Sequence, residues 1–435
     1  MAALPDLVAE HETDFILALF TTLAGKPCAK LVPAASAGAL GDGEMGFAGF
    51  AAGWMGQEPK DPDLLVLPDP ASFTPLPFIK KGLALVHCDP HVEGVPWHYS
   101  PRIILQRVLE QTKAAGFDAM VGTEIEYFLV RRDAAGELVR ADPADAQPQP
   151  CYDARDVTRM FDHLADVSRA MNTLGWGNYA NDHEDANGQF EQNFAYADAL
   201  TTADRVITGR YVISMIAEQR DMIATFMPKP FVDLTGSGMH MHMSLWDGDK
   251  PAFPVDGSDV HGLGLSETAH HFVGGILEHA PALQAVLAPI VNSYKRTRAA
   301  SPTSGASWSP NLATWGGNDR THYLRVPDGN RVELRGGDGA ANPYLAMAAA
   351  LAAGMDGVER QVDPGAPGDA TNAAALPSTL IHAIDALAAD DVVRGALDAA
   401  GPGVADWYAE MKTTEFTSWH SQVTPWEIER YLRAF

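Results

Sequence analysis

Positive charge is scarce in this chain of 435 residues. Its 31 Lys and Arg stand against 56 Asp and Glu, which gives a formal charge of −25 at pH 7. A nucleic-acid-binding surface needs clustered positive charge against the phosphates, so this balance excludes nucleic acid as a partner. Hydrophobic residues make up 46% of the chain, enough for a large core and too many for a disordered acidic protein.

Cysteine is also rare, and Cys28, Cys88 and Cys151 lie far apart in the sequence. This odd, scattered set argues against a disulfide framework or a Cys-type zinc site, and it predicts a reducing compartment, the cytoplasm. The longest apolar run, residues 345–355, is too short to cross a bilayer, so we expect no membrane partner. The N-terminal stretch is acidic and does not resemble a signal peptide.

The character of the sequence changes near residue 100. Pro101 stands at a plausible first helical position, and helical periodicity follows it. We therefore predict two domains, over residues 1–100 and 101–435. Hairpin-like strands mixed with helices favour an α+β fold over a strictly parallel α/β sheet.

Periodicity and punctuation predict the individual elements. Near the N-terminus, we expect a helix within 12–33 that ends at Gly25, a strand around Ala29–Val32, and a Gly- and Ala-rich loop over 36–62. Further strands are predicted at 63–69, 84–89, 119–130, 188–194, 237–246 and 331–335. Further helices are predicted at 155–174, 203–220, 266–287, 342–358 and 378–398. Asn342 and Ser378 are residue types that cap helix N-termini.

Two pairs of ligand-type residues alternate along predicted strands. Glu124 and Glu126 lie two apart, so their carboxylates share one face of a strand. His240 and His242 repeat this spacing, and neutral imidazole is a common metal ligand. The alternatives are the solvated face of an antiparallel sheet for the glutamates and two structural core residues for the histidines.

Two further segments carry the same kinds of side chain. Arg331, Glu333 and Arg335 share one strand face, as either an ion-pair ladder or a metal ligand between anion-binding arginines. Glu184 and Glu191 flank a turn-forming Asn-Gly pair, and alone they are equally compatible with exposed hairpin charges.

The combination of these segments is more informative than any member. Five glutamates and one histidine suffice for two oxygen-rich sites, which suit Mg²⁺ or Mn²⁺. Metal pairs together with clustered arginines are typical of phosphoryl transfer. The sequence has no GxxxxGK[ST] loop, so it is not a P-loop enzyme. The arginines are Arg296, Arg320, Arg325, Arg331 and Arg335.

Several motifs, in order along nearly the whole chain, resemble the glutamine synthetase family. They are GTEIEYFL, HEDANGQFE, TFMPKPF, GSGMHMHMSLW, NSYKR, NDRTHYLRVP, RVELR, ANPYLAMAAALAAGMDG and VTPWEIERY. The resemblance implies a small N-terminal β-grasp-like domain and a C-terminal catalytic domain with an antiparallel sheet and helices. It also implies ATP-dependent activation of the γ-carboxylate of glutamate as γ-glutamyl phosphate, followed by amide formation with an amine.

The resemblance assigns expected roles by motif position. One divalent metal would be held by Glu126, Glu184 and Glu191, and a second by Glu124, His240 and Glu333, with two to three Mg²⁺ or Mn²⁺ per site. Glutamate would be bound by Gly236, Arg296 and Arg335, and Arg320 would stabilise the transferring phosphoryl group, so that Arg320, Glu184 and Glu191 take part in catalysis. ATP would be contacted by His242, Ser244, Arg325 and Arg331. The family assembles as two stacked rings, so we expect a dodecamer whose active sites lie between subunits.

Departures from the family pattern concern the amine. Where ammonia-using members have Phe-Asp-Gly-Ser-Ser in an N-terminal loop, this chain has Phe47-Ala48-Gly49-Phe50-Ala51. Trp308 falls where a flap glutamate is expected, and Trp54 matches an aromatic of the contributed loop. Apolar groups in place of two carboxylates favour an amine with an alkyl group.

The pattern is most similar to the branch of type III glutamine synthetases and γ-glutamylmethylamide synthetases. We therefore expect a glutamate–methylamine ligase or a close alkylamine ligase. The alternatives are a glutamine synthetase that uses ammonia, a family member without catalysis, and a guanidino kinase on a related scaffold. The complete set of ligand positions disfavours the second alternative, and the complete glutamate-binding set disfavours the third.

Overall fold

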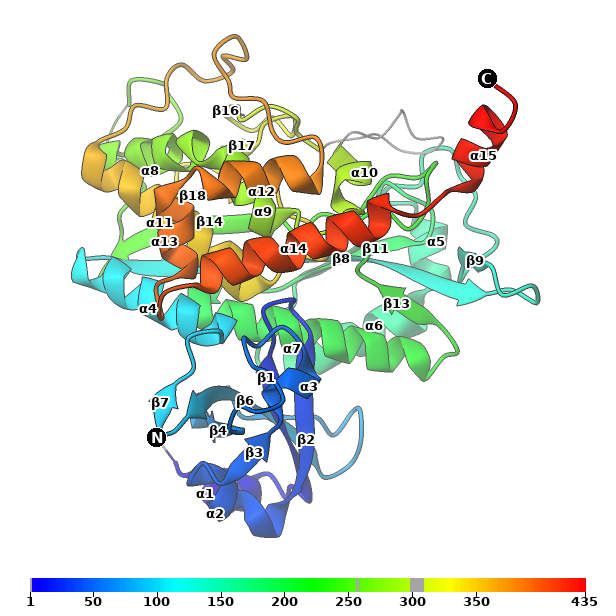
Figure 1. Cartoon of the computed structure of the whole chain (residues 1–435), viewed down its shortest axis with the longest axis vertical. Coiled ribbons are helices and arrows are strands. Elements are labelled where there is room, and N and C mark those ends of the chain that lie inside the picture. The colour runs from blue at the N-terminus through cyan, green and yellow to red at the C-terminus, as the bar shows by residue number, and fades with distance from the viewer. Residues whose placement is uncertain (1, 256, 258, 298–308) are drawn as a thin grey trace.

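The chain forms two β-sheets with helices around them (Figure 1). The computed structural model describes residues 2–255, 257, 259–297 and 309–435. The predicted α+β class is confirmed, with mixed sheets and helices throughout the described part. None of the helices in that part is both long and apolar enough to cross a membrane.

The smaller sheet lies in the N-terminal part of the chain, drawn in blue in Figure 1. Its strand order is β2-β1-β6-β4-β3, with β5 and β7 paired to β6. The strands are β1 (Phe15–Thr21), β2 (Pro27–Pro33), β3 (Met45–Phe47), β4 (Leu64–Pro68), β5 (Thr74–Pro75), β6 (Leu83–Val92) and β7 (Val95–Pro96). The short helices are α1 (Leu4–Glu10), η1 (Ala34–Ser36), α2 (Ala37–Gly41), α3 (Gly49–Ala52) and η2 (Pro70–Ser72).

The larger sheet has the order β10-β11-β8-β14-β18-β17-β16, with β9, β12 and β13 paired to β8 and β15 paired to β14. Almost all of its pairs are antiparallel, as expected. The strands are β8 (Asp118–Arg132), β9 (Leu138–Arg140), β10 (Ala180–His183), β11 (Gln189–Asn193), β12 (Ala197–Asp198), β13 (Ile223–Thr225), β14 (Met241–Asp247), β15 (Lys250–Pro251), β16 (Trp315–Gly316), β17 (Leu324–Asp328) and β18 (Arg331–Leu334).

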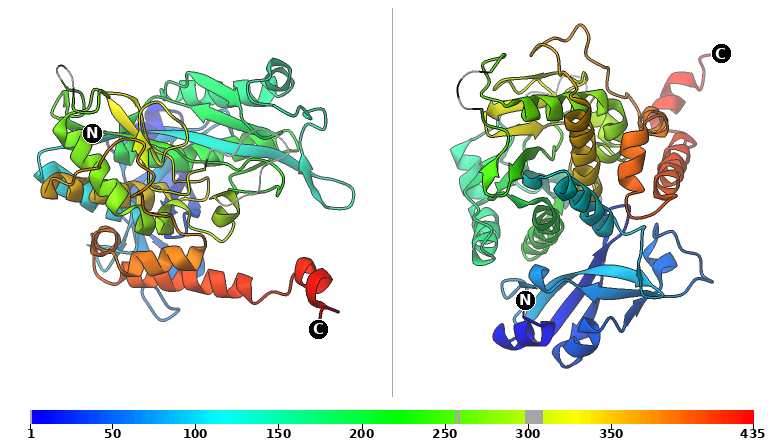
Figure 2. Two further views of the ribbon diagram at one scale, coloured as in Figure 1. Left: turned by 90° about the horizontal axis from the view of Figure 1, so that it is seen from above. Right: turned by 90° about the vertical axis from the view of Figure 1, so that its left-hand side faces the viewer.

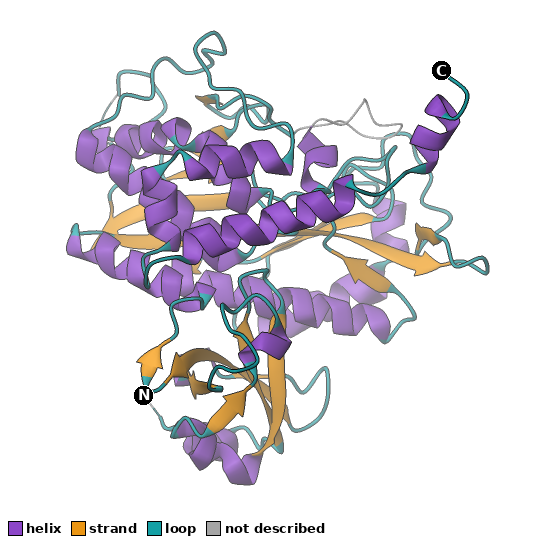
Figure 3. Ribbon diagram, in the orientation of Figure 1, coloured by secondary structure: helices purple, strands orange, loops and turns teal. Residues whose placement is uncertain are grey.

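Helices gather around the larger sheet (Figure 3). Helix α7 packs against β8, and the Ala-rich α11 packs against α4 and α8 within the main core. The C-terminal helix α15 extends away from the rest of the chain in both views of Figure 2. The helices are α4 (Pro101–Ala114), α5 (Ala154–Arg159), α6 (Phe161–Thr173), α7 (Ala199–Glu218), α8 (Glu267–Glu278), α9 (Ala280–Leu287), α10 (Ser293–Thr297), α11 (Pro343–Arg360), α12 (Leu380–Ala388), α13 (Asp391–Leu397), α14 (Val404–His420) and α15 (Pro425–Tyr431).

Residue 100 lies between β7, the last strand of the smaller sheet, and α4, which begins at Pro101 as predicted. The division into domains at that point remains a prediction. A buried ion cluster links the two sides: Arg102 on α4 donates to Asp69 and Asp89 from the smaller part and to Asp204 on α7. Tyr344 on α11 donates to the same Asp204 at 2.6 Å.

Several predicted elements are corrected by the structure. The helix within 12–33 is wrong, because its apolar run 15–20 lies in β1 between β2 and β6, where main-chain pairing on both sides favours a strand. The loop 36–62 contains α2, β3 and α3. The helices predicted at 155–174, 266–287 and 378–398 are each two helices, and β14 begins only at Met241. Thr379, rather than Ser378, caps α12, whereas Asn342 caps α11 as predicted.

Candidate active site

The middle of β8 presents Glu124 and Glu126 to one face of the larger sheet. In the antiparallel β8–β11 pair, Glu191 lies directly opposite Glu126, so its side chain reaches the same face. One carboxylate oxygen from each of the three residues lies within 4.8 Å of the others. The expected shared face of Glu124 and Glu126 is therefore observed, and β11 adds a third carboxylate to it.

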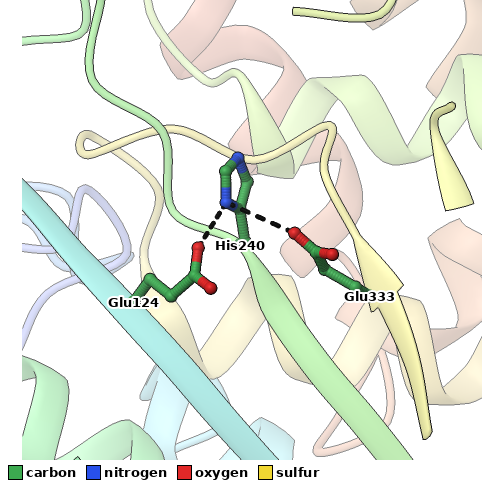
Figure 4. A group of neighbouring side chains, drawn as sticks. All are labelled: Glu124, His240 and Glu333. Carbon is green, nitrogen blue, oxygen red and sulfur yellow. Dashed lines mark hydrogen bonds and ion pairs between the residues drawn. The ribbon is translucent and has the colours of Figure 1, made fainter. Parts of the chain in front are cut away.

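A second group on this face combines Glu124 with His240 and Glu333 (Figure 4). His240, just before β14, places Nδ1 2.5 Å from Glu124 Oε2 and 3.5 Å from Glu333 Oε1. Glu333 comes from β18 and is fully buried. Its two oxygens also accept from Arg335 and Arg325, each at 2.5 Å. Glu333 therefore lies between two arginines, but Arg325 replaces Arg331 of the predicted ladder, since Arg331 bonds His242 and Asp328 instead. Its role as a metal ligand stays a prediction.

His242 orients Glu124 from the neighbouring strand. Arg331 Nε donates to His242 Nδ1 at 3.2 Å, which makes that nitrogen the acceptor and places the ring proton on Nε2. Nε2 then donates to Glu124 Oε1 at 3.0 Å. Glu124 therefore has one oxygen on His242 and the other on His240, and these contacts fix its carboxylate plane.

Carboxylates outnumber cations around Glu184 and Glu191. Burial, reinforced by the charges of Glu126 and Glu124, raises the pKa of Glu184 well above its usual range. Burial and the charges of Glu124 and Glu184 do the same to the pKa of Glu191. Although burial acts in the opposite direction, His240 and His242 hold the pKa of Glu124 well below its usual range. Repulsion among oxygen donors of this kind is relieved by a divalent cation, so the residues present fit Mg²⁺ or Mn²⁺.

These acidic groups line a cavity of about 400 Å³ together with three of the predicted cationic residues. Arg320 is exposed at the cavity, whereas Arg296 and Arg335 are 6% and 2% exposed. Among the residues that the structure describes, Arg296 Nη1 and Arg335 Nε have no hydrogen-bond partner. Burial lowers the pKa of Arg296 although Asp338 opposes the shift. Unpaired nitrogens of buried guanidinium groups at a cavity are suited to an anionic ligand.

Two glycines allow the chain to pass close to this cavity. A Cβ atom on Gly236 would lie 2.3 Å from the carbonyl oxygen of Pro228 and 3.0 Å from Arg296 Cγ. A Cβ atom on Gly238 would lie 2.9 Å from Glu126 Oε1. Gly238 N donates to Glu126 Oε2 at 2.7 Å, so the close approach also holds that carboxylate.

A second cavity, of about 570 Å³, shares Glu124, Tyr179 and Asn193 with the first. Tyr196 and Trp246 supply aromatic surface to it. Among the predicted ATP contacts, His242, Ser244 and Arg331 line this cavity. Arg325 is not among its lining residues and instead bonds Glu333 and Asn318. An aromatic cavity that joins a carboxylate cluster suits a ligand with an apolar end and a charged end.

The predicted amine residues lie apart from these cavities. Ala48 is exposed at the N-cap of α3, and Trp54 is 42% exposed with φ of 57°. Neither lines either of these two cavities. This placement agrees with the expectation that they serve a neighbouring subunit, which remains a prediction. Trp308 lies outside the described residues.

The structure adds cavity residues that sequence analysis missed. Gln189 lies two residues before Glu191, and its Nε2 donates to Glu126 Oε2 at 2.9 Å, so strand alternation could have identified it. Asp182 pairs with Glu191 across β10 and β11. Tyr152 and Lys229 come from loops, and only the tertiary structure brings them to the cavity.

Comparison with known proteins extends over the whole chain. The family model described as "Glutamine synthetase, catalytic domain" matches residues 98–431. A glutamine synthetase of Rhizobium leguminosarum bv. phaseoli is 41% identical over 97% of both chains. A glutamate–methylamine ligase of Methyloversatilis universalis is 40% identical over 98% of both chains.

Solved structures give a similar result. The structure of a GmaS/ADP complex has a TM-score of 0.93 and 45% identity to this chain, and it covers 99% of this chain and 100% of its own. GmaS without ligand has a TM-score of 0.92 and 43% identity over 100% of both chains. Both sequence and fold are therefore similar to these relatives along nearly the entire chain.

Proposed function

The chain belongs to the glutamine synthetase family, and from that membership we propose that it joins the γ-carboxylate of glutamate to methylamine or a similarly short alkylamine, at the expense of ATP. The ligase class itself is common to the family. The observation that supports the proposal is that two cavities share Glu124 in their lining. One cavity is lined by the carboxylate cluster and by arginines, and the other has an aromatic lining.

Two cation sites are proposed at these carboxylates, where Glu124, Glu126 and Glu191 form one close group and Glu184 lines the same cavity. Glu126, Glu184 and Glu191 would hold one divalent cation, and Glu124, His240 and Glu333 a second, with two to three Mg²⁺ or Mn²⁺ in total. When bound, such ions neutralise phosphate oxygens and polarise the group that is transferred. Glu184 and Glu191 support this assignment, because burial and the charges of neighbouring glutamates both raise their pKa values.

The arginines would bind glutamate and stabilise the phosphoryl group during its transfer. Arg296 and Arg335 orient glutamate beside Gly236, and their unpaired nitrogens are available for its carboxylates. A γ-carboxylate oxygen then attacks the γ-phosphorus of ATP, and the bond to the β-phosphate oxygen breaks to release ADP. Arg320, at the same cavity, stabilises the charge on the transferring group. His242, Ser244 and Arg331 contact the nucleotide, whereas Arg325 contributes through Glu333.

Attack by the amine on the carbonyl carbon of γ-glutamyl phosphate completes the reaction. The new C–N bond displaces phosphate, and the amine nitrogen loses its extra protons to cavity carboxylates or water. Ala48 supports an alkylamine, because it replaces the family's carboxylate with a methyl group. The named activity of the Methyloversatilis relative supports the same choice, whereas relatives named glutamine synthetase support ammonia as the alternative.

Ala48 and Trp54 need a neighbouring copy to reach the cavity, so the proposal includes a ring-shaped homo-oligomer, with a dodecamer of two stacked rings as the expected state. The separation of α3 from both cavities within one chain supports this arrangement. Domains over 1–100 and 101–435 would then supply the two sides of each active site.

An amine panel tests the proposal directly. Glutamate, MgATP and either ammonium, methylamine or ethylamine are combined with the enzyme, and phosphate release and product mass are measured. We expect the highest kcat/KM with methylamine. A higher kcat/KM with ammonium would reject the alkylamine assignment and leave a glutamine synthetase. No glutamate-dependent phosphate release with any amine would reject the ligase.

Ala48→Asp sharpens the test. It restores a carboxylate at an N-cap position, where Asp stabilises a helix by about 1 kcal/mol relative to Ala, so the variant should fold. We expect the preference to shift toward ammonium by about tenfold, since one methyl group in an apolar pocket is worth about 1–3 kcal/mol. Ala135→Asp adds the same charge at an exposed turn and serves as the control, with no shift expected.

A further inference from the structure

Asp145 is a buried carboxylate behind the hairpin that carries Glu184 and Glu191. It lies in the loop between β9 and α5 and is 1% exposed. It lines neither of the two cavities described above. None of the sequence motifs includes it, and the proposed reaction does not use it.

The Asp145 carboxylate accepts three hydrogen bonds from the turn of this hairpin. His183 Nε2 donates to Oδ2 at 2.7 Å, Gly188 N donates to Oδ2 at 2.5 Å, and Asn187 Nδ2 donates to Oδ1 at 2.8 Å. The three donors lie on both sides of Glu184. One carboxylate thus holds both arms of the turn from which the Glu184 side chain projects.

His183 transmits this contact to Glu184 itself. Its Nδ1 lies 2.8 Å from the carbonyl oxygen of Glu184, which can only accept, so this nitrogen also donates. The backbone N–H of Glu184 donates to Gln189 O at 2.9 Å. Both backbone groups of Glu184 are therefore tied, one to the opposite arm of the hairpin and one to Asp145 through a buried imidazole.

The same residues could be read as a metal site, because one ligand atom each from Asp145, Asp156 and His183 lies within 4.8 Å of the others. The hydrogen bonds argue against that reading. Both nitrogens of His183 donate, so neither offers a lone pair to a metal. Asp156 pairs with Arg159 on its own helix. The cluster is therefore better explained as a support for the hairpin.

We propose that Asp145 is a positioning residue that fixes Glu184 in the first cation site, together with His183. The inference rests on the proposed function in one respect, the assignment of Glu184 as a cation ligand. Outer-shell partners of metal ligands commonly change affinity by about 10–100-fold when they are removed. Asp145 does not bond the Glu184 side chain. It acts on Glu184 through the His183 ring and the Glu184 backbone carbonyl, and we expect this contact to affect cation affinity in the same way.

The test is a Mn²⁺ titration of the full chain freed of metal, followed by the EPR signal of free Mn²⁺. Asp145→Asn keeps the shape of the side chain but not the charge that His183 requires. We expect it to weaken one class of Mn²⁺ sites by about 10–100-fold, while the class that contains Glu124, His240 and Glu333 keeps its affinity. Asp156→Asn is the matched control, because Asp156 is also buried and lies near His183, but among the described residues it pairs with Arg159 and makes no hydrogen bond to the hairpin, so a much smaller change is expected.

Thermal unfolding shows whether Asp145→Asn folds. If it does not, Asn187→Ser replaces it, since that change removes one of the three bonds and should weaken the same class to a smaller degree. Wild-type affinity in the folded variant, or equal weakening of both classes, would overturn the inference. Failure of the wild-type chain to bind Mn²⁺ at all would instead overturn the proposed function, so the two failures are distinguishable.

Discussion

Arg102 offers the sharpest test of how the two sheets are held together. Its guanidinium is 4% exposed and bonds three carboxylates: Asp204 at 2.9 Å, Asp89 at 3.0 Å and Asp69 at 2.6 Å. Arg102→Met preserves much of the side-chain volume and removes the charge. Three carboxylates then face one another in the interface between the smaller sheet, α4 and α7.

Removal of one partner from a buried ion pair costs about 3–5 kcal/mol. The structure explains why three lost bonds do not triple that figure. The side chains of Asp69 and Asp89 are 26% and 21% exposed, so water can replace the arginine there, and Asp204 keeps its hydrogen bond from Tyr344. We therefore expect a loss of about 3–5 kcal/mol, which corresponds to a decrease in Tm of about 3–6 °C for a chain of 435 residues.

Differential scanning calorimetry of the full chain measures this loss. The control is Arg107→Met, which lies on the same helix with its side chain 41% exposed and pairs with Glu110, so its effect should stay within about 1 kcal/mol. Arg102→Met combined with Asp204→Asn should recover part of the loss, because one of the unpaired charges disappears. A Tm for Arg102→Met within about 1 °C of the Arg107→Met control, a threshold of about 1 kcal/mol, would refute the assignment of Arg102 as the interface anchor.

Three further predictions concern the site and the pH dependence of stability. His240→Ala should lower ATP-dependent turnover by at least about 100-fold with little change in Tm, since it removes a proposed metal ligand between two carboxylates, and wild-type turnover would reject the assignment. Gly236→Ala should raise the KM for glutamate at least about tenfold through the clash with Pro228, whereas Gly395→Ala, with open space around it, should leave kinetics unchanged. Burial opposes the charged form of His279, yet its hydrogen bonds to Asp390 and Asp356 raise its pKa, so its contribution is complete at pH values below about 6.5 and is lost as pH rises through the raised value. His279→Gln should therefore cost about 1–3 kcal/mol in thermal unfolding at pH 6 and less at pH 9, and an equal cost at both pH values would contradict this assignment.

Strand alternation made much of the candidate site predictable. Glu124 and Glu126 occupy one face because side chains alternate along β8. The same rule predicts that Val332 and Leu334 point to the other face of their strand from Glu333. The α+β class followed from hairpin-like strands mixed with helices. Asn342 and Pro343 predicted the start of α11, because cap and first-turn preferences depend on local backbone geometry.

The first strand shows the limit of that approach. The run 15–20 is apolar throughout, so no periodicity distinguishes a strand from a helix, and the prediction of a helix was wrong. The segment is a strand because it pairs with β2 on one side and with β6 on the other. The sequence alone does not show that these segments are its partners. Thr379 displaced Ser378 as the cap of α12 for a similar reason, since the choice between adjacent hydroxyl residues depends on where the helix packs.

The sequence by itself determined which chemical groups this protein has and which face of a strand each one occupies, because alternation and capping are local properties of the backbone. Only the tertiary structure decided which faces meet. It put Glu191 opposite Glu126, joined two cavities at Glu124, and brought Asp145 behind the hairpin of Glu184. Strand register and loop packing depend on contacts between distant segments, and no local pattern encodes those contacts one by one.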